Sequence, residues 1–116
     1  MYICPMYSNE LLKGTLKTIL LKLLSENDRM YGYEITQRVK ELSGEEIQIT
    51  EGALYPMLHK LEKEGLVQTE KVSIGKRVRK YYSLTPEGTV SSKAKMEEFA
   101  NFIRTMQMVL NPKPAH

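Results

Sequence analysis

The sequence is poor in the residues that form disulfides, metal centres and large aromatic sites. Its 116 residues include one cysteine, two histidines, two phenylalanines and no tryptophan. The lone cysteine, Cys4, excludes an intrachain disulfide, which fits a protein of a reducing compartment. Because one of the two histidines is His116 in the tail, we expect no metal site, and no other feature of the chain indicates a cofactor.

Long apolar runs are missing as well. No stretch approaches the roughly 20 apolar residues that span a bilayer, and no basic region precedes an apolar core at the N-terminus, as it would in a secretory signal. The chain also lacks a phosphate-binding glycine loop, paired zinc ligands and a plausible Ser/His/Asp set. We therefore expect a cytoplasmic protein that has no membrane partner and is not an enzyme.

The positive charge of the chain is concentrated in one segment. A net charge of +3 and a pI of about 8.9 carry little weight alone. Between Lys71 and Lys80, however, there are five cations and no acid: Lys71, Lys76, Arg77, Arg79 and Lys80. A solvated face is the simpler interpretation of an arbitrary charge run, but a basic patch on a mixed surface also marks a polyanion partner.

Apolar spacing predicts two helices in the first part of the chain. Residues 11–24 repeat leucine and isoleucine every three or four positions, with Ser8 or Asn9 as the N-cap and an end near residues 26–28. A second helix is expected after a turn at residues 30–33 and before Ser43-Gly44. Its predicted buried side consists of Tyr33, Ile35, Thr36, Val39 and Leu42.

A third helix is expected from Thr50, a favourable N-cap, to Gly65, after a short extended piece at residues 47–49. Leu54, Leu58 and Leu61 form its core stripe. Pro56 is awkward there, because it removes one backbone donor. A helix that begins at Pro56 is the alternative, but it would leave Leu54 outside the stripe, so the longer helix is preferred.

Two strands are predicted next, at residues 66–74 and 77–84, joined by the two-residue turn Gly75-Lys76, which suits a type II′ hairpin. This register places Lys71 opposite Lys80. Like charges directly opposed on a hairpin are destabilising. A protein tolerates them most easily beside an anion, so the register supports phosphate contact.

Thr85-Pro86-Glu87 opens a fourth helix that runs to Asn111. About 26 residues at roughly 1.5 Å per residue give a helix of about 39 Å, which is longer than a three-helix domain covers. A second copy of the chain is the simplest partner for its far end. The alternative is a helix folded back on residues 11–24, and an exchange between two chains would satisfy both. Its expected dimer seam consists of Met96, Phe99, Phe102, Ile103, Met106 and Leu110.

Together these elements predict a mainly α chain with a small β-hairpin. We expect a winged helix-turn-helix DNA-binding domain at residues 1–85, a long C-terminal dimerisation helix at residues 86–111 and a tail at residues 112–116. In that fold a helix enters the major groove of double-stranded DNA while the hairpin touches phosphates beside it. The candidate DNA-binding residues are Thr50, Glu51, Gly52, Tyr55, His59, Lys60, Lys76, Arg77, Arg79 and Lys80.

These candidates differ in the role that their chemistry indicates. Lys76 and Arg77 lie at the tip of the predicted hairpin, which is the wing of this fold, and they are the best phosphate ligands. Tyr55 either reaches the DNA or packs on the wing, and the sequence favours neither. Glu51 would repel phosphate unless it accepts from a cytosine amine or orients a neighbouring lysine. An exposed, neutral side chain is the simplest interpretation of His59, with phosphate contact second.

Three segments resemble the PadR family of bacterial transcriptional regulators. They are Gly32–Ile35 (GYEI), Leu54–Leu66 (LYPMLHKLEKEGL) and Arg79–Gly88 (RKYYSLTPEG), and the resemblance covers roughly residues 11–88. It implies a dimeric repressor that binds palindromic promoter DNA through its third helix and wing. Some members bind aromatic effectors between subunits, which implies a small aromatic or hydrophobic effector as a candidate partner. This chain departs from ligand-stacking members by lacking tryptophan.

Two hypotheses of different classes remain open at this point. The first is a homodimeric, sequence-specific transcriptional repressor, relieved by a small-molecule effector where one exists. The second is a winged-helix protein-interaction module that does not bind DNA, which the modest net charge allows. Replacing Lys76 and Arg77 with alanine discriminates between them, because only the first hypothesis makes these side chains essential for binding DNA.

Overall fold

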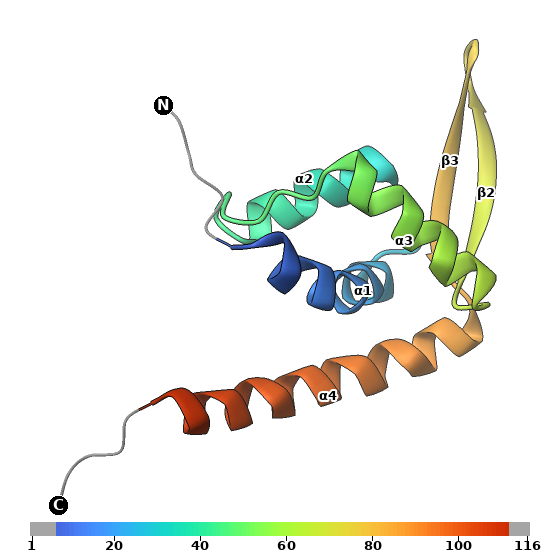
Figure 1. Cartoon of the computed structure of the whole chain (residues 1–116). Helices are drawn as coiled ribbons and strands as arrows, with labels where there is room; N and C mark the ends of the chain where they lie inside the picture. The colour runs from blue at the N-terminus through green and yellow to red at the C-terminus, as the bar shows by residue number, and fades with distance from the viewer. Residues whose placement is uncertain (1–6, 112–116) are drawn as a thin grey trace, which may run out of the picture.

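The computed structural model describes residues 7–111, in which four helices accompany a three-stranded antiparallel sheet (Figure 1). The elements are α1 (Asn9–Glu26), β1 (Met30–Tyr31), α2 (Gly32–Leu42), α3 (Glu51–Lys63), β2 (Val67–Ile74), β3 (Arg77–Leu84) and α4 (Pro86–Leu110). A mainly helical chain with a basic hairpin and a long last helix is therefore confirmed. Cys4, His116 and the predicted tail at residues 112–116 lie outside the described residues.

One hydrophobic core joins α1, α2, α3 and the sheet. Its fully buried side chains include Leu20 and Leu21 of α1, Ile35 of α2 and the predicted α3 stripe of Leu54, Leu58 and Leu61. Leu20 and Leu24 recur on one face of α1 as the spacing predicted. These stripes fix which side of each helix faces outward, and so they determine the surface available for binding.

The predicted buried side of α2 is wrong at two positions. Tyr33 and Leu42 are each 65% exposed, whereas Ile35 and Val39 are buried. Each helical residue turns the side chain by about 100°, so Tyr33 lies about 200° from Ile35 and points away from the core. Leu42 is the last residue of α2, where the helix leaves the core.

The predicted helix starts are confirmed by their capping hydrogen bonds. Ser8 Oγ accepts from the Leu11 amide at 3.3 Å, and Thr50 Oγ1 accepts from the Ala53 amide at 3.2 Å. Thr85 Oγ1 accepts from the Gly88 amide at 3.0 Å. Pro56 lies inside α3, so the longer of the two helices weighed for this segment is the one that forms.

The hairpin has the predicted register. Lys71 lies opposite Lys80, and Ile74 opposite Arg77, so that Gly75 and Lys76 form the two-residue turn. Gly75 has a φ of +62°, a value that glycine adopts without strain. A third strand was not expected: Met30 and Tyr31 were assigned to a turn, but they pair with Tyr82 and Tyr81 of β3. Two residues are too few to show strand alternation, so only the pairing with β3 defines them.

The helix α4 starts at the base of the hairpin and runs along α1, below it in Figure 1. The fold-back onto α1, which was the alternative to a second copy of the chain, therefore forms within the single chain. At its start, the Thr85 hydroxyl donates to the Gly65 carbonyl at 2.6 Å, and the Thr85 amide donates to the Leu66 carbonyl at 3.0 Å. These bonds join the end of α3, the sheet and α4 at one point.

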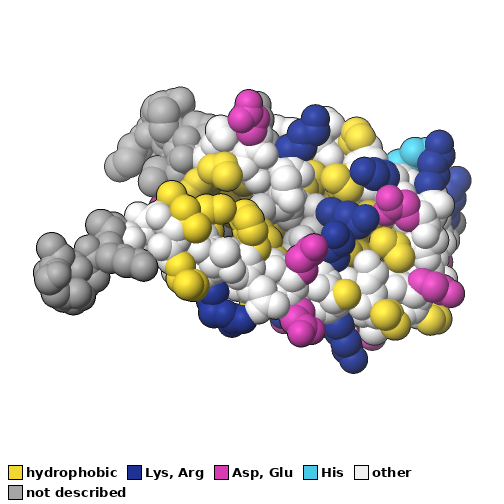
Figure 2. All heavy atoms as spheres, turned by 60° about the horizontal axis from the view of Figure 1, so that its bottom comes forward, with side chains coloured by type: hydrophobic (Ala, Val, Ile, Leu, Met, Phe, Trp, Pro, Cys, Tyr) yellow, Lys and Arg dark blue, Asp and Glu magenta, His cyan; other side chains and the backbone are white. Residues whose placement is uncertain are grey.

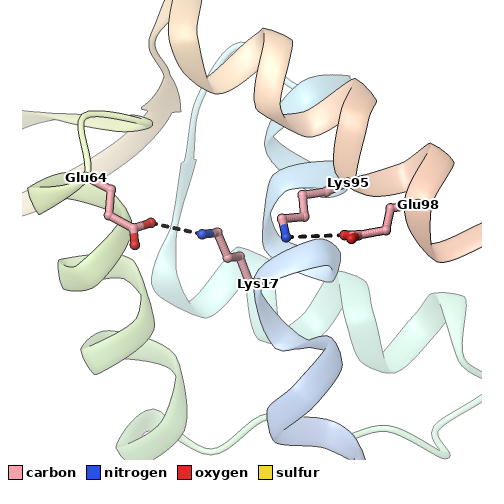
Figure 3. Close-up of polar contacts among 4 residues, drawn as sticks. All are labelled: Lys17, Glu64, Lys95 and Glu98. Carbon is pink, nitrogen blue, oxygen red and sulfur yellow. Dashed lines mark hydrogen bonds and ion pairs between the residues drawn. The ribbon is translucent and has the colours of Figure 1, made fainter.

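An ion pair also ties α1 to the end of α3. Lys17 reaches from α1 to Glu64, with Nζ 3.0 Å from Oε1, while Lys95 and Glu98 pair within α4 (Figure 3). The hydrogen bond from Lys17 lowers the pKa of Glu64 below its ordinary value. A lowered folded-state pKa stabilises the fold above the ordinary pKa of a glutamate, and this contribution is lost as the pH falls through the lowered value.

The hydroxyl of Ser92 in α4 is buried without a hydrogen-bond partner among the described residues. Burying an unpaired hydroxyl costs free energy, so Ser92→Ala is expected to leave the free energy of unfolding unchanged or to raise it by about 1 kcal/mol. Urea denaturation at one fixed protein concentration measures this, with Ser91→Ala as the matched control. A loss of stability above about 1 kcal/mol would show that the hydroxyl is bonded after all.

Candidate nucleic-acid interface

The helix α3 exposes the residues that were predicted to bind DNA. Because Leu54, Leu58 and Leu61 anchor one face of α3, the residues between them turn outward. The exposed set is Thr50, Glu51, Gly52, Tyr55, His59 and Lys60. The Thr50 cap leaves the remaining backbone donors of the first turn free for an anion.

The basic turn of the hairpin points to the same side of the molecule. Lys76 and Arg77 occupy and follow the turn, and both are exposed. In Figure 1 the hairpin turn points to the top, the side on which α3 begins, whereas α4 lies along the bottom. The fold therefore brings the α3 surface and the wing cations to one side of the molecule and leaves α4 on the other.

A notch of about 210 Å³ lies between α3 and β3. It is lined by Tyr55, His59 and Glu62 of α3 together with Lys80 and Tyr82 of β3. Lys80 Nζ lies 5.5 Å from the centre of the Tyr82 ring, and burial raises the pKa of the Tyr82 hydroxyl. Lys80, Tyr55 and His59 thus come together around one opening with the Glu62 carboxylate, so that hydrogen-bond donors and an acceptor face the same space.

Tyr55 packs on the start of α2 and remains 43% exposed. A Cβ atom placed at Gly32 would overlap the Tyr55 hydroxyl and would lie 2.8 Å from its ring carbon Cζ. Glycine at position 32 leaves room for the ring in this position, and any larger residue would require Tyr55 to shift. Packing is therefore one role of Tyr55, on the first turn of α2, and its exposed part is free to reach a ligand. Sequence reasoning missed the role of Gly32, although a glycine that opens a helix was a visible signal.

Arg79 and Lys80 were predicted together, but they lie on opposite faces of the hairpin. Arg79 stacks over the Tyr31 ring at 4.0 Å, and Arg29 stacks over the Tyr81 ring at 4.2 Å. The two tyrosine rings meet edge to face at 5.6 Å, and Arg29 also pairs with Glu70 at 2.7 Å. A hydrogen bond with Tyr81 raises the pKa of Arg79.

This stack connects the start of α2 to the wing. Adjacent residues of a strand point to opposite faces, so Arg79 faces away from the notch that Lys80 lines. Arg29 and Tyr31 were not among the predicted site residues. Their roles depend on pairing between β1 and β3, which no local sequence pattern predicts.

The predicted seam residues of α4 fall into an exposed group and a partly buried group. Phe102, Ile103 and Leu110 are 53%, 43% and 70% exposed, whereas Met96, Phe99 and Met106 are partly buried. Figure 2 shows hydrophobic side chains gathered over the end of α4 nearest the C-terminus. Val109 and Met108 add to the exposed apolar surface there.

Within residues 7–111 the structure has neither a cluster of metal-binding side chains nor a membrane-spanning helix. No three His, Cys, Asp or Glu side chains in this range come together in a group able to hold a metal ion. None of the helices in the described part of the chain combines the length and apolar character needed to cross a membrane.

In this chain α2 and α3 form a helix-turn-helix, and the basic hairpin of β2 and β3 follows it. The outer face of α3 and the hairpin turn are exposed on the same side, which defines a winged helix-turn-helix protein. The chain belongs to the transcriptional regulator PadR-like family, which residues 20–94 match. This family consists of DNA-binding transcriptional regulators rather than enzymes.

Individual relatives agree with this assignment. The chain is 33% identical to "Transcriptional regulator Rv3488" of Mycobacterium tuberculosis over 79 residues, which is 68% of this chain and 70% of that protein. It is 35% identical over 97 residues to an uncharacterized protein of Lysinibacillus sphaericus, covering 82% of this chain and 87% of the relative. A transcriptional regulator from Clostridium thermocellum has a similar structure, with a TM-score of 0.82 and 31% identity over 91% of this chain and all of that chain.

Proposed function

We propose that this chain is a cytoplasmic, sequence-specific repressor that acts as a homodimer on a palindromic promoter site. Residues 1–85 would form the DNA-binding domain, and the helix at residues 86–111 would form the dimer. The observation that carries this proposal is the division of the molecule into two sides. Exposed α3 residues and wing cations face one way, and the apolar far end of α4 lies on the other.

Within the proposed interface, each element has a distinct task. The exposed residues of α3 enter the major groove, where base edges are read, while Lys76 and Arg77 contact phosphates beside it. A two-fold dimer then places two such interfaces on half-sites about 34 Å apart, or a multiple of that distance. A dimer held on a promoter site in this way blocks access of the polymerase.

The test is binding to a labelled fragment of the promoter upstream of the protein's own gene, at two salt concentrations with competitor DNA. Saturable, salt-sensitive binding that survives competitor supports a sequence-specific regulator. Transcription from the same fragment, with and without the protein, then distinguishes repression from activation. Binding that competitor abolishes, on this and on other promoters, would contradict sequence specificity, and no DNA binding at low salt would favour a protein-interaction module.

The double substitution Lys76→Ala with Arg77→Ala is expected to weaken DNA binding to a similar extent across sequences. Each neutralised phosphate contributes about 0.9 to the slope of log K against log salt, so losing two cations should reduce the slope by about 1.8. Fluorescence anisotropy across a salt series measures both quantities. The matched control is Lys22→Ala with Lys93→Ala, which removes the same charge from α1 and α4. An unchanged slope in the wing variant would exclude these side chains as phosphate ligands.

A further inference from the structure

A second opening lies against a different face of α3 from the notch. This groove runs between the N-terminal half of α1 and the first turns of α3, and it has a volume of about 610 Å³. Its walls include Leu12 and Leu16 of α1 and Pro56 and Met57 of α3. Volumes of about 300–1,000 Å³ with mainly apolar walls are typical of sites for small molecules.

The lining of the groove also carries positive charge. Lys13 of α1 and Lys60 of α3 line it, and none of the residues that line it is acidic. Neither lysine takes part in an ion pair within residues 7–111, although six such pairs occur there. An apolar groove with two ammonium groups that form no ion pair within residues 7–111 is complementary to a molecule that has an apolar body and one anionic end.

The groove is also part of the surface proposed to bind DNA. Gly52 and Pro56 both line it, and they stand four residues apart in α3. Because Pro56 has no amide hydrogen, the Gly52 carbonyl lacks the donor that an α-helix would otherwise supply. The first turn of α3 is therefore held by fewer backbone bonds than the rest of the helix, and a ligand seated against it acts on its least constrained part.

We propose that this groove binds a small amphiphilic carboxylate and that binding weakens the affinity for DNA. The apolar body lies between α1 and α3, and the carboxylate pairs with Lys13 and Lys60. Lys60 is also a proposed DNA contact, so the carboxylate neutralises a cation that would face phosphate. The effect on DNA rests on the proposed function, whereas binding of the carboxylate does not.

The first experiment titrates the full-length protein with decanoate and, as the uncharged counterpart, 1-decanol, using isothermal calorimetry without DNA. Decanoate is expected to bind with a saturable signal and more tightly than 1-decanol. Ala53→Phe fills the groove from an exposed position and is expected to abolish this binding, while Val90→Ser, at an exposed position of α4 outside the groove and the seam, is expected to leave it unchanged. Lys13→Gln should weaken decanoate about two- to fivefold, the range of an exposed ion pair.

Several outcomes would overturn the site: no saturable binding of decanoate, equal binding of 1-decanol, or binding that Ala53→Phe leaves intact while Val90→Ser removes it. A second copy of the chain that covers the groove would produce the first of these. DNA affinity with and without saturating decanoate tests the coupling separately. Binding of decanoate to a protein that does not bind DNA contradicts the proposed function but leaves the site standing, and DNA affinity unchanged by bound decanoate contradicts the coupling alone.

Discussion

Gly88→Ala is expected to lower the free energy of unfolding by about 2–4 kcal/mol, within or slightly above the usual range for overpacking. An added Cβ atom at position 88 would overlap the Leu66 carbonyl oxygen, and would lie 2.9 Å from the Leu66 carbonyl carbon and 3.1 Å from Leu84 Cδ2. A flexible side chain can move away from such an atom, but the backbone of Leu66 cannot move freely. The Leu66 carbonyl accepts the Thr85 amide, which fixes it at the joint between hairpin and helix.

Chemical denaturation followed by circular dichroism measures this loss, and Gly14→Ala is the matched control. Gly14 lies inside α1, and a Cβ atom there meets nothing within 4 Å. Because alanine favours a helix over glycine, this control is expected to gain about 0.5–1 kcal/mol. The same substitution at two helical glycines should therefore have opposite signs. Equal effects at both positions would contradict the close approach of α4 to Leu66.

Phe102→Asp combined with Ile103→Asp is expected to convert the proposed dimer into a monomer. These side chains are 53% and 43% exposed in the single chain, so their burial requires a partner. Losing two large apolar contacts at roughly 1.5–3 kcal/mol each raises the dissociation constant by at least about 100-fold. Burying two carboxylates in the seam adds a further penalty.

Sedimentation equilibrium measures the assembled mass against the chain mass of 13.4 kDa. Arg104→Asp is the control, because it changes the net charge by the same two units and because Arg104 lies about 200° from Phe102 and about 100° from Ile103, away from the seam. The control should remain a dimer, and the seam variant should keep its helical content while losing affinity for a palindromic site. A wild-type protein that sediments as a monomer at all concentrations would contradict the dimer.

Local chemistry was sufficient to predict most of the fold. The caps at Thr50 and Thr85 depend on side chains within three residues of the amides that they bind, and the turn at Gly75-Lys76 fixes the pairing of β2 with β3. Leucine spacing placed α1 and α3 correctly, and Pro56 did not displace the start of α3. Each of these features is determined by a short segment of the chain.

The features that sequence missed depend on residues far apart in the chain. Met30 and Tyr31 form a strand only because β3 passes beside them, and Gly32 matters only because the Tyr55 ring lies against it. The separation of Arg79 from Lys80 follows from strand alternation, but the stacking of Arg79 on Tyr31 required the third strand. The positions of the candidate site residues were thus predictable, while their orientations and partners were not.

The shared joint at Thr85 has a consequence for the target DNA. The Thr85 hydroxyl caps α4 and also bonds to the end of α3, while Gly88 packs against Leu66 in the same segment. The junction between the wing and α4 is therefore rigid. In a dimer built through α4, the distance between the two wings and their relative rotation would then be fixed by the protein. One extra base pair between half-sites turns the second site by about 35° along the duplex, since a turn holds 10–10.5 base pairs. Such a regulator would discriminate between operators by the spacing of their halves as well as by the bases within them.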